Sequence, residues 1–430
     1  MFSVAYFILL EDFFRGLVER RLMHQYISQY TPFPLPSPSS RLFNTSDVSI
    51  IVPTVGFEPS QFSRALISWL SNKPLEVIVV TTHRECTRTQ ALLNSEPIQA
   101  AVNETGLRLL TVAVANKRTQ LVCGINEAKG RIIALVDDDA FWIQEILINL
   151  LAPFQVEDVG LVGGPIESYV PSERKDSAVI TGWEVAALRA RSKREGGNKA
   201  FYMRDGSTNF TVSGATMLLR SEILKEPVFQ TEFTGETFMG QRMNSGDDSF
   251  ITRWMLFQHL REDRKGGAKW RLGMQITPEA TVFTALIPDR KFAEQMKRWL
   301  RTGLRFRLMC LLSDPGLRNF WRTTPYMCRK MVEAMFNPLL TLVWYLCYFK
   351  IFRAHPLAAL LIALYYFYGL VSSYVAFGRQ FPYARNKIWA AILLDRFAMV
   401  SDWYSWATLA QENWASRKGV DVETGEICCR

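Results

Sequence analysis

The sequence has few cysteines, and those it has follow no recognisable pattern. Seven cysteines are scattered over 430 residues, with neither the paired spacing of a zinc site nor an even disulfide framework. Zinc-finger spacing and basic repeats interleaved with aromatic residues are also absent, so the net charge of +9 does not indicate nucleic-acid binding. Much of the positive charge lies in residues 290–330, just before an apolar C-terminal part, which favours a membrane surface as the partner.

The first residues do not resemble a secretory signal. The first ten residues, MFSVAYFILL, are too few to cross a bilayer, which requires roughly 20 residues. The acidic residues Glu11 and Asp12 follow, and no small-residue cleavage site stands out. We expect residues 1–30 to form an apolar, amphipathic segment, either an interfacial helix or the remnant of a longer span.

Strand-like and helix-like segments alternate after a proline-rich linker at residues 31–47. The apolar runs are VSIIVPTV, LEVIVVTT, LRLLTVAVA and RIIALVDDD, with GLVGGPI as a fifth candidate. Continuous Val, Ile and Leu runs are typical of strands buried on both faces, so the pattern predicts an α/β fold with a mostly parallel sheet. Ligands bind such sheets beyond the carboxyl ends of the strands.

Three consecutive aspartates, Asp137, Asp138 and Asp139, follow the fourth apolar run. Alternate residues of an extended strand point the same way, so Asp137 and Asp139 are expected to converge, with Asp138 on the other side. Their mutual repulsion is relieved if Mg²⁺ or Mn²⁺, which also binds substrate phosphates, lies between them. An ordinary acidic surface turn is the alternative.

Two further motifs carry candidate site residues. In SGDDSFITRWM, Asp248 opens a predicted helix and could serve as a general base, whereas Asp247 or Asp248 as a helix cap is the alternative. In QMKRWLRTGLRFRL, helical spacing places Gln295, Arg298 and Trp299 on one face. This helix either binds substrate or is a plain amphipathic helix on a surface.

Two long apolar stretches, Ala334 to Phe352 and Pro356 to Gly378, are separated by a tight connection and predict a transmembrane hairpin. Two buried helices of a globular core are the alternative. Basic residues flank the hairpin, which predicts that the large domain is cytoplasmic. They are Arg318, Arg322, Arg329, Lys330, Arg379, Arg385 and Lys387. Charged Asp395, Arg396 and Asp402 interrupt the next apolar stretch, which we expect to be interfacial or re-entrant.

The order of these motifs resembles the processive branch of glycosyltransferase family 2, which includes hyaluronan, chitin and cellulose synthases. The chain is most similar to fungal membrane-bound type 2 glycosyltransferases, which are hyaluronan-synthase-like. The likeness runs from about Val48 to Lys418 and rests on VDDDAFW, SGATMLLR, GDDSFITRWM, TPEATVFT, FAEQMKRWLRTGLR and WASR. It implies a GT-A catalytic domain that uses a UDP-sugar and Mg²⁺ or Mn²⁺, and a part in fungal cell-wall synthesis and hyphal growth.

The resemblance also implies roles for individual residues. Asp248 falls on the general base, and Asp137 and Asp139 fall on the metal-binding motif. Nucleotide contacts are implied for Pro53, Thr54, Lys117, Arg118, Asp137, Arg298, Trp414 and Arg417. Contacts with the donor sugar or the acceptor are implied for Ser213, Gly214, Asp247, Gln295 and Trp299.

One position departs from the family pattern. Thr81 and Thr82 stand where many members carry an aspartate that contacts the nucleoside. Only two membrane spans are clear, fewer than the family usually has. Two spans are few for a closed channel that exports a polymer, so an oligomer is one way to build such a channel.

The expected product is a β-linked polysaccharide made by an inverting multi-pass enzyme of the plasma membrane. The alternatives are an inactive membrane scaffold of the same fold and a non-processive transferase that makes a glycolipid. The expected organisation is an N-terminal segment (1–30), a linker (31–47), a GT-A domain (48–288), an interfacial region (289–330), a transmembrane hairpin (331–380), an interfacial or re-entrant segment (381–418) and a tail (419–430). Cys428 and Cys429 in that tail are either lipidated or free thiols.

Overall fold

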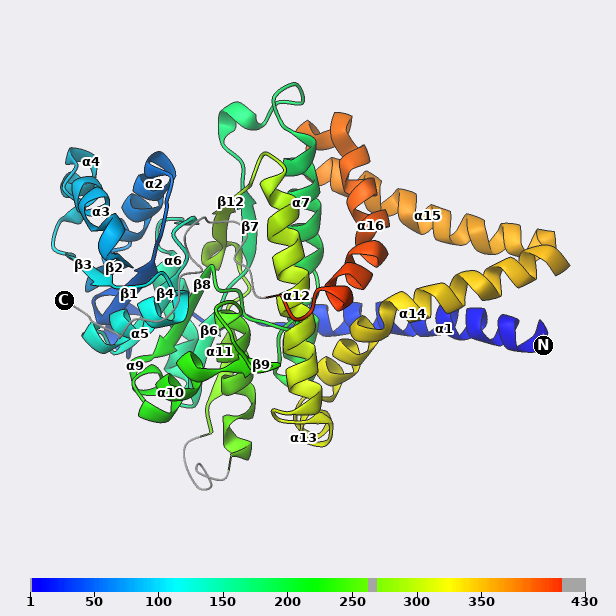
Figure 1. Cartoon of the computed structure of the whole chain (residues 1–430), viewed down its shortest axis with the longest axis horizontal. Coiled ribbons are helices and arrows are strands. Elements are labelled where there is room, and N and C mark those ends of the chain that lie inside the picture. The colour runs from blue at the N-terminus through cyan, green and yellow to red at the C-terminus, as the bar shows by residue number, and fades with distance from the viewer. Residues whose placement is uncertain (1, 262–268, 412–430) are drawn as a thin grey trace.

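The computed structural model of the chain describes residues 2–261 and 269–411. Figure 1 shows a mixed α/β domain from which three long helices project to one side. These helices are α1 (Phe2–Gln29), α14 (Pro325–Ala354) and α15 (Pro356–Gln380). The molecule therefore has an α/β part and a helical projection.

A seven-stranded sheet forms the centre of the α/β domain, in the order β11-β6-β8-β4-β1-β2-β3. Its strands are β1 (Val48–Pro53), β2 (Glu76–Thr82), β3 (Gly106–Val112), β4 (Ile132–Val136), β6 (Val159–Gly163), β8 (Thr216–Arg220) and β11 (Arg271–Met274). All neighbouring strands pair in parallel except β8, which is antiparallel to both β4 and β6. The five apolar runs of the sequence thus correspond to β1, β2, β3, β4 and β6.

Helices cover both faces of this sheet, as continuous apolar strands require. In β1, Ile50 faces a core formed with α2 (Pro59–Leu70), whereas Ile51 faces a core formed with α5 (Lys117–Glu127) and α11 (Asp247–Phe257). Both side chains are fully buried, and each contributes about 1.5–3 kcal/mol by leaving water. Burial on both faces holds β1 in place in the sheet. It therefore also fixes the position of the carboxyl end of β1, where the candidate site lies.

A smaller sheet closes one end of the domain, with the strand order β5-β12-β7. Its strands are β5 (Ala140–Trp142), β7 (Ile166–Tyr169) and β12 (Val282–Ala285). The indole of Trp69 donates to the carbonyl of Ala140 over 2.9 Å, and the indole of Trp142 donates to Thr216 over 3.0 Å. These bonds anchor the chain directly after the three aspartates.

The remaining elements lie around these sheets. They are α3 (Cys86–Leu93), α4 (Glu96–Val102), α6 (Ile146–Leu151), α7 (Gly182–Glu195), α8 (Asn198–Asp205), α9 (Ser221–Leu224), α10 (Pro227–Gly235), β9 (Thr237–Phe238), β10 (Gln241–Arg242), α12 (Lys291–Leu312), α13 (Leu317–Thr323) and α16 (Ile388–Ala407). The predicted linker contains no α-helix or strand, and Phe33 exchanges hydrogen bonds with Gln275 beyond β11.

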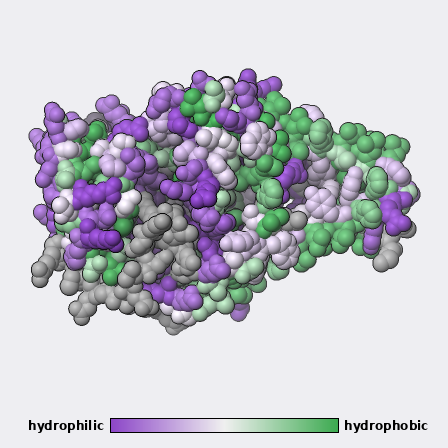
Figure 2. Space-filling model, turned by 45° about the horizontal axis from the view of Figure 1, so that its top comes forward, coloured by the Kyte–Doolittle hydropathy of each residue, from purple (hydrophilic) through white to green (hydrophobic). Residues whose placement is uncertain are grey.

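Helices α14 and α15 are each long and apolar enough to cross a membrane, and most of their apolar surface is uncovered. Figure 2 shows hydrophobic side chains over the projecting helices and many hydrophilic ones over the α/β domain. The N-terminal segment forms one helix, α1, whose Ala5 and Leu9 are buried against Cys347, Ile351 and Ala359 of this hairpin. The short apolar run at the start of the sequence therefore packs with the hairpin.

Candidate active site

A cleft of about 840 Å³ opens beyond the carboxyl ends of β1 and β4. Among the predicted site residues within the described ranges, all but Arg118 line it. They are Pro53, Thr54, Lys117, Asp137, Asp139, Ser213, Gly214, Asp247, Asp248, Gln295, Arg298 and Trp299. Trp414 and Arg417 lie outside the described residues. The structure thus brings together motifs separated by more than two hundred positions.

The three aspartates form a turn immediately after β4 ends at Val136. The amide of Ala140 donates to the carbonyl of Asp137 over 3.1 Å and closes this turn. Asp138 borders the same cleft, and its carboxylate accepts a 2.6 Å hydrogen bond from Thr54. The prediction that Asp138 points to the other side was therefore wrong, because the chain leaves the extended conformation before it reaches this residue.

Lys117 connects two of the acidic motifs. Its Nζ lies 2.7 Å from Asp137 Oδ1 and 2.8 Å from Asp247 Oδ2. Burial lowers the pKa of Lys117, but the two carboxylates outweigh burial and hold it well above its ordinary value. The lysine is therefore a permanent cation that offsets the negative charge of the cleft.

The two aspartates that contact Lys117 differ in their own pKa shifts. Burial raises the pKa of Asp247, but Lys117 outweighs that effect and the net shift is downward. For Asp137, burial and the nearby carboxylates of Asp247 and Asp138 prevail over Lys117, and the pKa rises. Asp247 is thus the firmly ionised partner of the lysine.

Asp248 lies in the first turn of α11, after a glycine in the left-handed conformation. Gly246 has φ +72°, and a Cβ there would come within 2.9 Å of Thr302 in α12. The N-cap position is Gly246 and has no side-chain cap, so neither Asp247 nor Asp248 is the helix cap. Asp248 Oδ1 accepts a 2.7 Å hydrogen bond from the amide of the next residue, Ser249. The side chain also borders the cleft, where a carboxylate can accept a proton.

Gly214 provides the space that these charged side chains occupy. A Cβ on this glycine would lie 3.3 Å from Asp248 Cβ, 3.6 Å from Asp247 Oδ2 and 3.7 Å from Lys117 Nζ. The first of these distances is shorter than ordinary van der Waals contact. The glycine in the SGATMLLR stretch therefore permits the close approach of the lysine and the two aspartates.

Helix α12 supplies the opposite wall through Gln295, Arg298 and Trp299. Sequence reasoning missed the contribution of α7, whose Arg191 lies 5.6 Å from the ring of Trp299 and lines the cleft with Lys193. The run RARSKRE in α7 was the available signal, but a charged surface helix has the same composition. Cations from α5, α7 and α12 therefore surround the cleft, as binding of an anionic diphosphate requires.

The described residues contain no group of three or more His, Cys, Asp or Glu that could hold a metal ion. Asp137 and Asp139 nevertheless border the same cleft, and Mg²⁺ commonly binds one or two carboxylates together with substrate phosphates and water. The donor set therefore fits a metal whose coordination is completed by a nucleotide diphosphate.

Thr81 and Thr82 are buried in β2 and do not line the cleft. The hydroxyl of Thr81 donates to the carbonyl of Thr54 over 3.0 Å, and the amide of Thr54 donates to Val80 over 2.9 Å. Thr81 thus stabilises the end of β1.

The fold and the cleft define a GT-A nucleotide-sugar transferase. A family model described as "Glycosyltransferase like family 2" matches residues 46–302, and the chain belongs to this family. A mannosyltransferase from Pyrobaculum calidifontis, solved with GDP-Man and Mn²⁺, shares the fold with a TM-score of 0.53 and 15% sequence identity. The match covers 97% of this chain and 100% of that one.

Fungal proteins are similar over most of the chain. The "NDP-glycosyltransferase ltbB" of Aspergillus luteorubrus is 30% identical over 407 residues, which cover 94% of this chain and 95% of that protein. A "Type 2 glycosyltransferase" of Zymoseptoria tritici is 28% identical over 409 residues, covering 92% of this chain and 80% of the relative. The predicted family, the GT-A fold and the likeness to fungal type 2 glycosyltransferases are therefore confirmed.

Proposed function

We propose that the protein is an inverting transferase that moves a sugar from a UDP-sugar to an acceptor hydroxyl. The observation that carries this proposal is the position of Asp248, which shares one cleft with the lysine-bridged pair Asp137 and Asp247 and with Arg298. A proton acceptor and cations suited to a diphosphate thus border the same space.

The reaction needs one proton transfer and one displacement. Asp248 takes the proton from the acceptor hydroxyl, and the acceptor oxygen forms a bond to the anomeric carbon. The bond between that carbon and the diphosphate oxygen breaks, and the nucleoside diphosphate leaves with the electron pair. A Mg²⁺ or Mn²⁺ ion held by Asp137 and Asp139 would neutralise charge on the diphosphate. Arg298 and Lys117 orient the diphosphate from the protein side.

The proposed acceptor is a growing β-linked polysaccharide of the fungal cell surface or wall, made by an enzyme with a cytoplasmic catalytic domain and a transmembrane hairpin in the plasma membrane. The uncovered apolar surface of α14 and α15 supports the membrane part of this proposal. The basic residues that flank the hairpin in the sequence support the orientation.

A glycolipid product is the second candidate, because apolar side chains also line the cleft. Ile166, Ile287, Met296 and Leu300 are among the lining residues, and Met296 and Leu300 belong to the same α12 that presents Gln295. An acceptor with a hydrocarbon part would bury it there. Sizing the product distinguishes one added sugar from a long polymer.

The test is release of nucleoside diphosphate from detergent-solubilised protein with a panel of UDP-sugars and GDP-mannose. Release in Mn²⁺ or Mg²⁺, abolished by EDTA, is expected for one donor. Because a general base contributes about 10²–10⁴-fold, Asp248→Asn should lower kcat by that factor while donor binding persists. Folded wild-type protein that releases nothing with any donor would favour the inactive scaffold.

A further inference from the structure

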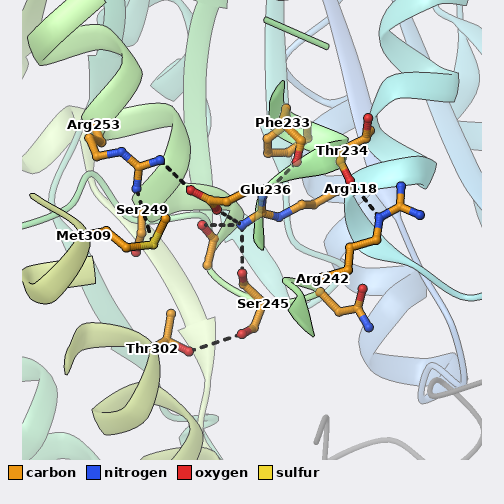
Figure 3. Close-up of polar contacts among 12 residues, drawn as sticks. Arg118, Phe233, Thr234, Glu236, Arg242, Ser245, Ser249, Arg253, Thr302 and Met309 are labelled. Atoms are coloured by element: carbon orange, nitrogen blue, oxygen red, sulfur yellow. Dashed lines mark hydrogen bonds and ion pairs between the residues drawn. The ribbon is translucent and has the colours of Figure 1, made fainter. Parts of the chain in front are cut away.

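The residue that follows Lys117 points away from the cleft. Arg118 is 1% exposed, and Figure 3 shows its guanidinium at the centre of a group of polar contacts. It donates hydrogen bonds to the carbonyls of Phe233 (2.8 Å), Ser245 (3.0 Å) and Gly246 (3.3 Å) and pairs with Glu236 (2.6 Å). The expectation of a nucleotide contact for Arg118 therefore does not match its position in the structure.

Glu236 joins Arg118 to the helix that carries Asp248. Its second oxygen accepts from Arg253 of α11, and Arg253 Nε lies 3.1 Å from Asp314 Oδ2. Burial raises the pKa of Glu236, but Arg253 and Arg118 outweigh burial and the net shift is downward. One ionised carboxylate is therefore shared by two buried guanidinium groups.

Lys117 and Arg118 hold the same loop from opposite sides. Lys117 binds the side chain of Asp247 from the cleft, whereas Arg118 binds the two carbonyl groups just before it from behind. Ser245 also contacts Thr302 of α12 through its hydroxyl, at 3.4 Å (Figure 3). The loop that leads into Asp248 is thus fixed at its backbone as well as at its side chains.

We propose that Arg118, acting through Glu236 and the carbonyl groups of Ser245 and Gly246, is a positioning residue for Asp248. This inference rests on the proposed function, in which Asp248 accepts the acceptor proton. A small displacement of a catalytic group has a large effect on rate, because misplacement by about 1 Å can cost 10²-fold. The guanidinium reaches two sides at once, because Nη1 donates to the carbonyl of Phe233 while Nη2 contacts Glu236, Ser245 and Gly246. A single ammonium group has no such fork and cannot span both sets of acceptors.

The experiment compares Arg118→Lys with Arg220→Lys. Arg220 is a matched control because it also donates to backbone carbonyls, those of Val159 (2.8 Å), Phe154 and Val156 (both 3.4 Å), and does not line the cleft. Both variants should lower the melting temperature. Arg118→Lys should lower kcat by about 10–100-fold with the donor KM within about twofold, whereas Arg220→Lys should keep kcat.

The outcomes separate the positioning role from the others. Unchanged kcat and donor KM in folded Arg118→Lys would reject the positioning role. Unchanged kcat with a raised donor KM would also reject it, and would indicate that Arg118 contributes to nucleotide binding. Glu236→Asp, which keeps the charge but shortens the link, should also lower kcat and replaces Arg118→Lys if that variant fails to fold. Wild-type protein without transferase activity would instead reject the proposed function itself.

Discussion

Lys117 determines the charge balance of the cleft. Asp137, Asp139, Asp247 and Asp248 all border the same space, and the described contacts of Asp137 and Asp247 converge on this one ammonium group. Because a lysine at the start of a helix lies near the positive end of the helix dipole, its position is favourable only through these carboxylates. The lysine therefore ties the aspartate turn after β4 to the first residue of α11.

The space around these charges is set by Gly214, and filling it should impair catalysis. In Gly214→Ala, the new Cβ lies 3.3 Å from Asp248 Cβ, so the carboxylate must shift by a few tenths of an ångström. We expect kcat to fall about 10-fold with little change in melting temperature. Steady-state kinetics would check this against Gly16→Ala, where a Cβ meets nothing within 4 Å. Equal activity of the two variants would show that the close packing is unimportant.

Much of this residue-scale arrangement was predictable. Asp137, Asp139, Asp248 and the QxxRW residues line one cleft, as the motif order and the resemblance to glycosyltransferase family 2 led us to expect. The direction of Arg118 was not predictable, since its partners at Glu236 and Ser245 lie more than one hundred positions away. Asp138 was misplaced because the pattern does not show where β4 stops being extended.

Helix α7 links the cleft to the helices beyond it. Its first turn is held by a capping box between Thr181 and Glu184, and Glu184 also binds Arg174 through two hydrogen bonds of 2.6 and 2.7 Å. Farther along, Arg189 binds Asp395 of α16 at 3.1 Å. The charge that interrupts the apolar pattern of α16 therefore has a partner on the helix that lines the cleft.

The start of α7 should make a pH-dependent contribution to stability. Burial raises the pKa of Glu184, but Arg174 and the cap outweigh burial, so the folded pKa lies below the usual 4.5. The contribution of Glu184 to the free energy of unfolding is present above about pH 4.5 and is lost as pH falls through the folded pKa. We expect Glu184→Gln to cost about 1.5–3 kcal/mol at pH 7, with the difference from wild type shrinking below pH 4.5.

Thermal unfolding at pH 7 and at pH 4 or below would measure this effect. Glu173→Gln is the charge-matched control, because Glu173 is exposed and close in sequence. A constant difference between wild type and Glu184→Gln at every pH would contradict the expectation. Such a result would mean that the loss comes from replacing an acceptor oxygen of Glu184 by an amide group and not from the ionisation of the carboxylate.

At the scale of the whole molecule, the projecting helices form a unit with the N-terminal helix. The ring of Tyr6 lies 5.8 Å from that of His355, the residue between α14 and α15, so α1 begins at the tip of the hairpin (Figure 1). Near the domain, Glu19 of α1 pairs with Arg329 and Lys330 of α14. This pairing was not predictable, because the short apolar run of α1 gives no indication of a partner so far along the chain.

The exposed face of α15 should determine membrane attachment. Leu361 and Leu364 are 61% and 53% exposed and share one helix face. Replacing both by Asp should cost about 2.5–3.5 kcal/mol each at the centre of a bilayer, and the protein should leave the carbonate-resistant membrane fraction. The control is the double variant Leu35→Asp and Leu42→Asp, at exposed positions outside the helical projection. This control protein should stay in the carbonate-resistant membrane fraction. Retention of both double variants would contradict a membrane-spanning hairpin.

The contact of α1 with the hairpin also sets an order of assembly. The hydroxyl of Tyr366 binds Asp12 at 2.6 Å, although the two residues are 354 positions apart. At about 5–20 residues per second, a ribosome needs roughly 20 to 70 seconds between them. Helix α1 must therefore wait for α15, and the helical projection closes only after the α/β domain between them has been made.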